Sequence, residues 1–396
     1  MKLKSVKTST VIECILAAIV LYVASGCATS QISSAPTLAA HAGAPSIEIK
    51  AIAMSPDGGL LADAVAVELN NRGYVIIDSG STSRMMIRLN LNEVDIALPV
   101  GLAKLKEQGI GHQTMTFKRF NSLPREEAIT ILGDRILNNL VTTRKTIEFC
   151  GQNNYVYRVS SDIFPLITYD EANVNLEDLP NYNDIQDEFD NISQSIIDSN
   201  VRVSAHPSEF NSLSSLTPRV VEKTITELNF YSSFFDRIGL PADTNSPMNL
   251  HVHNNNGTRE EISHRFYENF KRLDENCQAR LVIENDDKLN CWSVKELVDI
   301  FHPITRIPIT FDYLHHKCHP NNLTEREAIN MCWDTWQTRP LFHYSESRVG
   351  NNPRAHADYG ENTFDTYGLK FDIDMELKAK DYAIEHFVEV SKGVTI

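Results

Sequence analysis

Short apolar runs recur through the second half of the chain, and each of six runs ends in a residue that can bind a metal ion. The six terminal residues are His206, His251, Glu284, Asp312, His343 and Glu376. They lie 45, 33, 28, 31 and 33 residues apart. One strand, one crossover helix and two loops need about 30 residues, and a continuous apolar run is typical of a buried parallel strand. The pattern therefore predicts repeated β–α units that bring six side chains to one end of a parallel sheet.

Two further strand patterns bring the number of predicted strands to eight. They lie at residues 87–91 and 155–160, and helical patterns alternate with the strands at 125–150, 184–199, 216–238, 258–275, 292–301, 323–335 and 378–389. Eight alternating strands and helices are the number of a closed (β/α)8 barrel, whose active sites lie at the C-terminal ends of the strands. We therefore expect an α/β fold of the TIM-barrel class, with the barrel domain over residues 85–396.

The first 84 residues follow a different pattern. Three lysines within the first seven residues precede an apolar run at 15–23 and a stretch of small residues that ends in Cys27. This order is typical of a bacterial lipoprotein signal, with Cys27 as the lipidation candidate; the alternative is an uncleaved or spurious leader. We expect a leader over residues 1–27, then a linker and a small α/β lipoprotein-like segment over 28–84.

Composition and charge narrow the class of protein. Hydrophobic residues make up 42% of the chain and charged residues 22%, as is ordinary for a globular protein. The net charge of −15 argues against a broadly basic, nonspecific nucleic-acid binder, although a local basic cleft is compatible with it. The seven cysteines form no CxxC pair, which argues against a disulfide framework or a thiolate zinc site. A reducing compartment suits the barrel domain, whereas the leader predicts export.

Two more histidines join the strand-end residues. His315 follows Asp312 by three residues, and His356 lies in the loop after His343. Alone, each such histidine could be a hydrogen-bonded structural residue, and each carboxylate a helix cap. Together, five imidazoles and three carboxylates exceed the needs of one divalent ion. Mixed nitrogen and oxygen ligands suit manganese, zinc or iron better than an all-oxygen magnesium site. The set predicts a multi-metal cluster, which can clamp a phosphodiester.

From about Ile110 to the C-terminus the chain resembles the UV damage endonucleases of the UvsE/UvdE type. The matching segments are RVSSDIFP at 158–165, HPSEF at 206–210, NLH at 249–251, ENDD at 284–287, FDYLHH at 311–316, HYS at 343–345 and DMELKAK at 374–380. The resemblance implies a TIM barrel related to endonuclease IV and the xylose-isomerase-like barrels, with up to three divalent metals. Manganese is favoured, and zinc, cobalt or magnesium are alternatives. The implied reaction is a nick immediately 5′ of a cyclobutane pyrimidine dimer or 6–4 photoproduct, leaving a 3′-hydroxyl and a 5′-phosphate.

The same resemblance assigns roles to residues. It makes all eight residues metal ligands, namely His206, His251, Glu284, Asp312, His315, His343, His356 and Glu376. Within this set it gives catalytic roles to Glu284, Glu376, His251 and Asp312. It places the two residues that wedge into the duplex at Glu209 and Phe210, where the family usually has Gln and Tyr. Leu341 is a further departure, because many members carry there a lysine that can be carboxylated to bridge two metals.

DNA binding and location follow from the same interpretation. The substrate is UV-damaged double-stranded DNA, with phosphate contacts from a basic loop that holds Lys104, Lys106 and His112 and from Lys118, Arg119, Lys317, Arg348 and Arg354. We expect a monomer that needs no protein partner. A repair enzyme belongs in the cytoplasm with the nucleoid, whereas the leader predicts a membrane lipoprotein, and the sequence leaves this conflict open.

Two alternatives remain at this point. One is a sugar isomerase or epimerase on the same type of barrel, whose sites hold one or two metals with mostly carboxylate ligands. The extra histidines and the stacking residue Phe210 argue against it. The other is a non-catalytic envelope lipoprotein with a degenerate barrel, which the leader favours and the eight intact ligand-type residues oppose.

Overall fold

The computed structural model describes the strand residues 76–78, 85–87 and 96–99 and residues 103–253, 256–350 and 352–391. The chain forms two compact units, one of Met1–Glu93 with Val388–Ile396 and one of Val94–Phe387. In the first unit the described strands β1 (Ile76–Asp78) and β2 (Met85–Ile87) form an antiparallel pair. The predicted leader and its lipidation candidate Cys27 lie outside the described residues.

The second unit is built on eight parallel strands. In chain order they are β3 (Ile96–Pro99), β4 (Val156–Val159), β5 (Val203–Ala205), β6 (Met248–Leu250), β7 (Leu281–Glu284), β8 (Ile309–Thr310), β9 (Leu341–Tyr344) and β10 (Asp372–Met375). Neighbours in the chain pair in the sheet, and β10 also pairs with β3. Between β8 and β9 a parallel bridge joins Asp312 to His343, and the His343 amide donates to the Phe311 carbonyl at 2.8 Å. The ring is therefore closed, and the predicted (β/α)8 barrel is confirmed.

The expected first barrel strand at 87–91 is wrong. Met85–Ile87 belongs to β2, which pairs with β1, and the barrel begins with β3 at Ile96–Pro99. The sequence explains the difference: 87–91 reads Ile-Arg-Leu-Asn-Leu, an alternation typical of a strand with one polar face. By contrast, 96–100 reads Ile-Ala-Leu-Pro-Val, the continuous apolar run that a parallel barrel strand requires.

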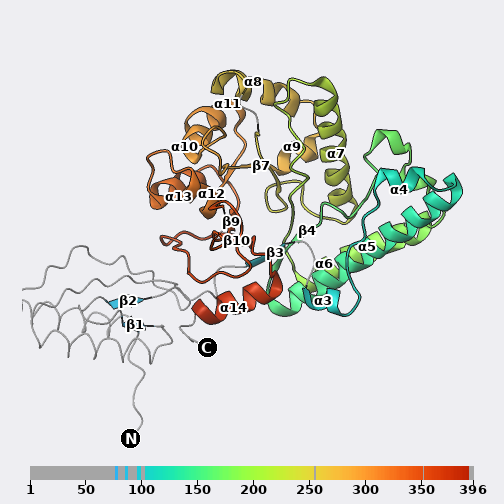
Figure 1. The fold of residues 1–396 in the computed structure, drawn as a ribbon, viewed down its shortest axis with the longest axis horizontal. Helices are drawn as coiled ribbons and strands as arrows, with labels where there is room; N and C mark the ends of the chain where they lie inside the picture. Colours follow the sequence, from blue (N-terminus) through green and yellow to red (C-terminus); the bar gives the residue numbers. More distant parts are fainter. Residues whose placement is uncertain are drawn as a thin grey trace, which may run out of the picture. The chain divides into compact units, whose positions relative to one another are not determined.

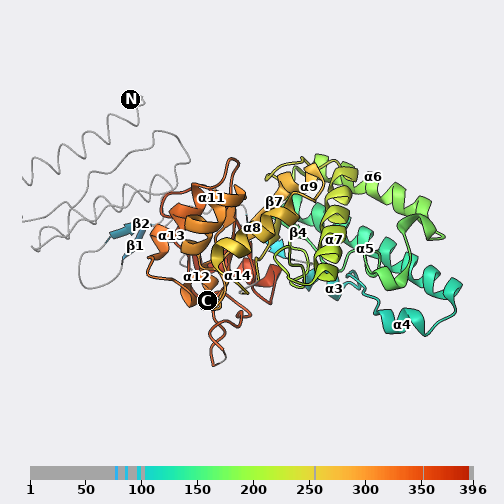
Figure 2. The same ribbon diagram turned by 90° about the horizontal axis from the view of Figure 1, so that it is seen from above.

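Helices surround the barrel (Figures 1 and 2). The longer ones match the predicted patterns: α5 (Arg125–Asn153), α6 (Tyr182–Ser199), α7 (Pro218–Arg237), α8 (Arg259–Phe270), α13 (Glu325–Trp333) and α14 (Asp381–Ser391). The pattern at 292–301 becomes α10 (Val294–Glu296), a π-helical turn (Leu297–Phe301) and α11 (His302–Thr305). The shorter helices are α3 (Ala103–Glu107), α4 (Phe117–Asn121), α9 (Glu275–Arg280) and α12 (Tyr313–Cys318), with single 3-10 turns at Asp170–Ala172 and Leu176–Asp178.

Local capping sets where several of these helices begin. Thr258, Thr324 and Ser293 each form a capping box with the glutamate three residues later. A capping box satisfies backbone N–H groups that the first turn leaves without a partner. Large apolar side chains such as Phe235, Phe266 and Phe301 are fully buried. In the described residues no helix has the length and apolar character needed to span a membrane.

Candidate metal centre

The closed barrel brings all eight predicted ligand residues to one end of the strands. Glu284 is the last residue of β7, His343 lies within β9, and the other strand-end candidates follow their strands by one or two residues. Three overlapping groups have ligand atoms within 4.8 Å of one another: His206–His343–Glu376, His206–His251–Glu284 and Glu284–Asp312–His343. The predicted convergence is therefore observed for these residues, and His315 and His356 extend the same cluster.

Glu284 lies at the centre of the cluster. Its Oε2 is 3.0 Å from His343 Nδ1, 3.4 Å from His206 Nε2 and 3.6 Å from His251 Nε2. Its Oε1 is 3.1 Å from His315 Nδ1. Burial alone would raise the pKa of Glu284, but the imidazoles, His343 first, hold this pKa well below its usual value. One buried carboxylate thus joins four imidazoles.

Glu376 forms a second node. Its Oε1 lies 3.5 Å from His343 Nδ1, and its Oε2 lies 3.6 Å from His356 Nδ1. His356 also contacts the Glu376 backbone carbonyl at 2.9 Å, and a bridge to Ser347 fixes it at the base of a hairpin. Arg158 of β4 bonds the Glu376 carboxylate. Burial opposes the charge of Glu376, but Arg158 and His343 outweigh it and lower the pKa of this carboxyl.

Asp312 acts both as a helix cap and as a site residue. Its Oδ1 accepts the His315 backbone N–H at 2.6 Å, which starts α12. The backbone is locked further by Asn285, whose Oδ1 accepts the Asp312 N–H at 2.8 Å. The other carboxylate oxygen, Oδ2, is buried and has no hydrogen-bond partner among the described residues. Burial raises the pKa of Asp312. The helix-cap alternative is thus correct for one oxygen, while the second is available to a ligand.

The donor set fits divalent cations. Burial opposes protonation of His343, but Glu284 raises its pKa to about 9. The pKa of His315 is held well above its usual value, against burial, by Asp312 and Glu284. Protons on these rings and a divalent cation are alternative ways to balance the buried carboxylates. The unbonded Asp312 Oδ2 and the short distances among nitrogen and oxygen atoms match a mixed-ligand site.

Several residues of the site were not assigned a role from the sequence. Asp286 lies 3.3 Å from His251 Nδ1, while His251 Nε2 faces Glu284. This is the arrangement in which an outer carboxylate orients a metal-binding histidine. Asn249 donates to Glu284. Both residues lie in segments that carry the family resemblance, so the signal was present, but only the folded geometry shows whom they contact.

The predicted wedge residues lie on the loop that follows His206. Phe210 is 82% exposed, and Glu209 is exposed as well. Asn211 anchors this loop, because its buried amide donates to the Ser208 carbonyl at 3.0 Å and to Glu227 Oε1 at 2.8 Å. A large apolar side chain is therefore presented to solvent on a fixed loop beside the cluster.

Some of the predicted DNA-contacting cations are exposed, and others are paired with carboxylates of the protein. Lys317 is exposed on α12, directly after His315 and His316. Arg348 pairs with Asp358, and Arg354 Nε lies 3.7 Å from Asp287 Oδ2, so both charges are balanced within the protein. In the predicted basic loop, Lys104 pairs with Glu385, and His112 Nε2 lies 3.2 Å from Thr143 Oγ1.

Lys118 and Arg119 are exposed on α4. Figures 1 and 2 place this helix beside the outer part of α5, away from the barrel strands. These two cations therefore lie far from the cluster, so the predicted contacts of Lys118 and Arg119 with DNA would be made away from the site.

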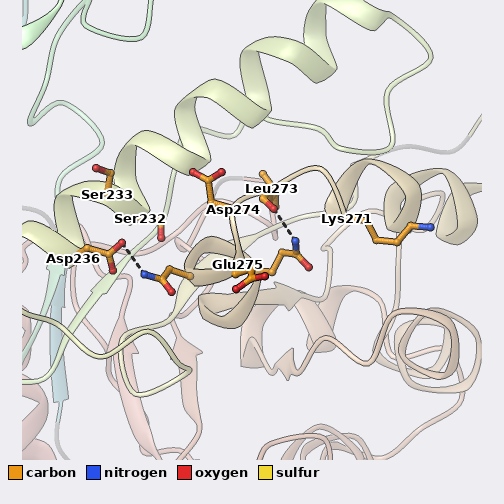
Figure 3. A pocket seen from close by; sticks show the side chains of 9 residues that line it. Ser232, Ser233, Asp236, Lys271, Leu273, Asp274 and Glu275 are labelled. Atoms are coloured by element: carbon orange, nitrogen blue, oxygen red, sulfur yellow. Dashed lines mark hydrogen bonds between the residues drawn. The ribbon is translucent and has the colours of Figure 1, made fainter.

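A larger cleft of about 630 Å³ lies elsewhere (Figure 3). It is lined by Ser232, Ser233, Asp236, Lys271, Leu273, Asp274, Glu275, Asn276 and Gln278. These residues come from the C-terminal end of α7, from α9 and from the loop before α9, which in a parallel barrel is the end opposite to the cluster. Asn276 donates to Asp236 at 3.0 Å, and Gln278 donates to the Leu273 carbonyl at 2.7 Å. None of these lining residues is a histidine, and the side-chain amides of Asn276 and Gln278 are already engaged in these two hydrogen bonds.

Comparisons with known proteins point to one family. The family described as UV-endonuclease UvdE matches residues 96–394. A UV DNA damage endonuclease of Bacillus cereus (strain Q1) is 31% identical over 288 residues, which cover 70% of this chain and 88% of the relative. Its counterpart in Bacillus anthracis (strain A0248) is 30% identical over 289 residues, with the same coverage. The crystal structure of SacUVDE is similar with a TM-score of 0.63 and 27% identity, covering 76% of this chain and 99% of that one.

Proposed function

Because this chain belongs to the UV-endonuclease UvdE family, it is a UV DNA damage endonuclease, and we propose that it nicks duplex DNA immediately 5′ of a pyrimidine photoproduct. The lesions are cyclobutane pyrimidine dimers and 6–4 photoproducts. The products are a 3′-hydroxyl and a 5′-phosphate. The observation that carries the proposal is Glu284, one buried carboxylate within 3.0 to 3.6 Å of four imidazoles at the end of the barrel strands.

The eight clustered residues would hold up to three divalent cations. Manganese suits the mixed imidazole and carboxylate set, and zinc, cobalt and magnesium are alternatives. Such ions, when bound, supply Lewis-acid stabilisation of the charge that develops on a phosphodiester during hydrolysis. The overlap of the three groups through Glu284, His206 and His343 supports a multinuclear rather than a single-ion arrangement.

The protein itself contributes position and charge. Burial of Glu284, Asp312 and His343 keeps bulk water away from their charged atoms, which strengthens electrostatic interactions at the reacting centre. Asp286 and Asn249 fix the two residues they touch, His251 and Glu284. A rigid outer layer of this kind preserves the geometry of the inner groups.

Lesion recognition is assigned to the exposed loop after β5. Phe210 presents an aromatic face that can stack where a damaged base pair is opened. Glu209 beside it adds negative charge near phosphates, which weakens rather than strengthens binding. Lys317 on α12 is the exposed cation nearest in sequence to the cluster residue His315 and is proposed to bind the phosphate backbone.

The test is a defined substrate. A duplex with one thymine dimer, labelled at the 5′ end of the damaged strand, is incubated with excess Mn²⁺. The expected product has the length of the segment up to the dimer, and its end is extended by a polymerase, which requires a 3′-hydroxyl. Undamaged duplex and the Asp312→Ala protein are the controls. Cleavage no greater than that by Asp312→Ala, or a product of another length, would contradict the proposal.

A further inference from the structure

The interior of the barrel beneath the cluster carries charge where aliphatic side chains usually fill such barrels. Asp372, Asp374 and Glu376 alternate along β10 and its end, so they share the face that points into the barrel. Asp372 and Asp374 are 2% and 0% exposed. Asp372 is bonded to Arg202 at 2.6 Å and Arg339 at 2.8 Å, at the far end of the strand from the cluster. Asp374 occupies the layer between Asp372 and the proposed metal ligand Glu376.

Asp374 connects two groups of the cluster. Its Oδ2 lies 2.9 Å from Arg158 Nη1, and the same guanidinium nitrogen bonds Glu376. The same Oδ2 lies 3.9 Å from His343 Nε2. Neither oxygen of Asp374 makes a hydrogen bond of standard geometry with the described residues. Beside it is a cavity of about 10 Å³ that is also lined by Asn249, Thr310 and Leu341.

The two nitrogens of His343 face different partners. Nδ1 points at Glu284 and Glu376, at 3.0 and 3.5 Å, which is the side where a cation would bind. Nε2 points at Asp374. A histidine that binds a metal through one nitrogen generally donates its other N–H to a carboxylate or carbonyl, which fixes the ring and its tautomer. The 3.9 Å between Asp374 Oδ2 and His343 Nε2 is about 1 Å longer than a hydrogen bond, and both residues line the small cavity.

Arg158 gives Asp374 a second task. A guanidinium that bonds Glu376 would repel any cation that this carboxylate holds. Asp374 balances that positive charge from the side away from the cluster, so Arg158 can orient Glu376 without weakening the site. A buried ion pair adds little net stability compared with well-packed apolar residues, so packing alone does not account for the pair.

On these grounds, and resting on the function proposed above, we propose that Asp374 is a positioning residue of the metal cluster. It orients His343 through Nε2 and neutralises Arg158, and thereby sets the affinity of the ion held between His343 and Glu376. It touches neither substrate nor reacting atoms.

The test measures metal binding by the full chain, independently of nicking. The protein is stripped with EDTA and titrated with Mn²⁺ against a chromophoric chelator, and bound metal is counted by inductively coupled plasma mass spectrometry. Asp374→Asn keeps the shape of the side chain and removes its charge, and we expect it to bind at least one Mn²⁺ 10- to 100-fold more weakly. Asp372→Asn is the matched control, because it removes a buried, arginine-bonded carboxylate from the same face of the same strand. It should bind Mn²⁺ like the wild type.

A second variant guards against simple misfolding. Arg158→Met combined with Asp374→Leu removes both buried charges, so it should fold, as judged by circular dichroism, yet still bind Mn²⁺ at least 10-fold more weakly. Wild-type affinity in Asp374→Asn or in the double variant would overturn the inference, as would an equal loss in Asp372→Asn. If the wild type itself binds no Mn²⁺, both the proposed metal site and the role of Asp374 are refuted. If the wild type binds Mn²⁺ and the Asp374 variants bind it with the same affinity, the proposed function stands and only the role of Asp374 is refuted.

Discussion

Replacing Glu284 by Gln is the sharpest perturbation of this site. The change keeps the shape of the side chain and removes one negative charge from the centre of four imidazoles. Two unit charges about 3.3 Å apart interact by about 5 kcal/mol at an effective dielectric constant of 20. A loss of about 4 kcal/mol of transition-state stabilisation corresponds to about a thousandfold slower reaction. We therefore expect single-turnover nicking of a thymine-dimer duplex to fall about a thousandfold or more.

The metal-free protein should respond as well. The pKa of Glu284 is held well below its ordinary value in the folded state, so its ionised form stabilises the fold. That contribution is present above the ordinary pKa of a glutamate and is lost as the pH falls through the lowered one. Glu284→Gln should therefore melt at a lower temperature than the wild type at pH 7 without metal. Mn²⁺ should raise the melting temperature of the wild type and raise that of the variant much less.

Both measurements are needed to judge the result. A variant with near-normal nicking and a normal Mn²⁺-induced shift would refute the assignment of Glu284 as the shared group of the cluster. A variant that melts like the wild type without metal but neither nicks nor responds to Mn²⁺ would keep the metal role and refute the electrostatic account of folding.

Three further predictions follow from other parts of the chain. Phe210→Ala should weaken discrimination between damaged and undamaged duplex by about 1–3 kcal/mol in equilibrium binding at fixed salt. Leu216→Ala, which alters another exposed side chain of the same loop, should leave this discrimination unchanged. Glu209→Gln should keep or raise the affinity for damaged duplex, and a large loss of affinity would reveal a role for that carboxylate. A protein of residues 94–396 should match the full chain in melting temperature and nicking rate, and an unfolded or inactive short form would show that part of 1–93 belongs to the barrel. Burial, and to a lesser extent Lys380, lowers the pKa of His112 to about 4, so protonation of this ring is unfavourable in the folded state. The free energy of unfolding should therefore be unaffected by His112 above pH 6.5 and should fall by up to about 3 kcal/mol between about pH 6.5 and 4. His112→Gln should flatten that part of the pH profile measured by urea denaturation.

Most of the barrel could be predicted from the sequence because a buried parallel strand is recognised from a short local run of apolar residues. Each of the six strand-end residues follows a continuous apolar run, and the crossover length fixes the spacing, so convergence follows from topology alone. The prediction of the first strand at 87–91 was wrong because the alternating run there was preferred to the continuous apolar run at 96–100. The pairing of β3 with β4 and β10 shows that the later run enters the barrel.

Contacts between side chains far apart in the sequence could not be predicted from the periodicity of apolar residues. Arg158 meets Glu376 across 218 positions of sequence, and nothing near either residue indicates the other. The same holds for Arg354 and Asp287, whose pairing turns an expected DNA contact into a balanced surface charge. Phe210 and Lys317 were predicted to contact DNA, and both side chains are exposed in the structure.

The seam between β8 and β9 has a consequence for how the enzyme matures. Asp312 and His343 close the ring of strands and also belong to the proposed metal site. A chain in which β8 and β9 have not yet paired does not hold Asp312 and His343 together, so the complete ligand set forms only when this seam is closed. Bound ions would link Asp312 to His343 across that seam and would slow its local opening. Hydrogen exchange at the His343 amide, which bonds Phe311 across the seam, would then report metal occupancy directly.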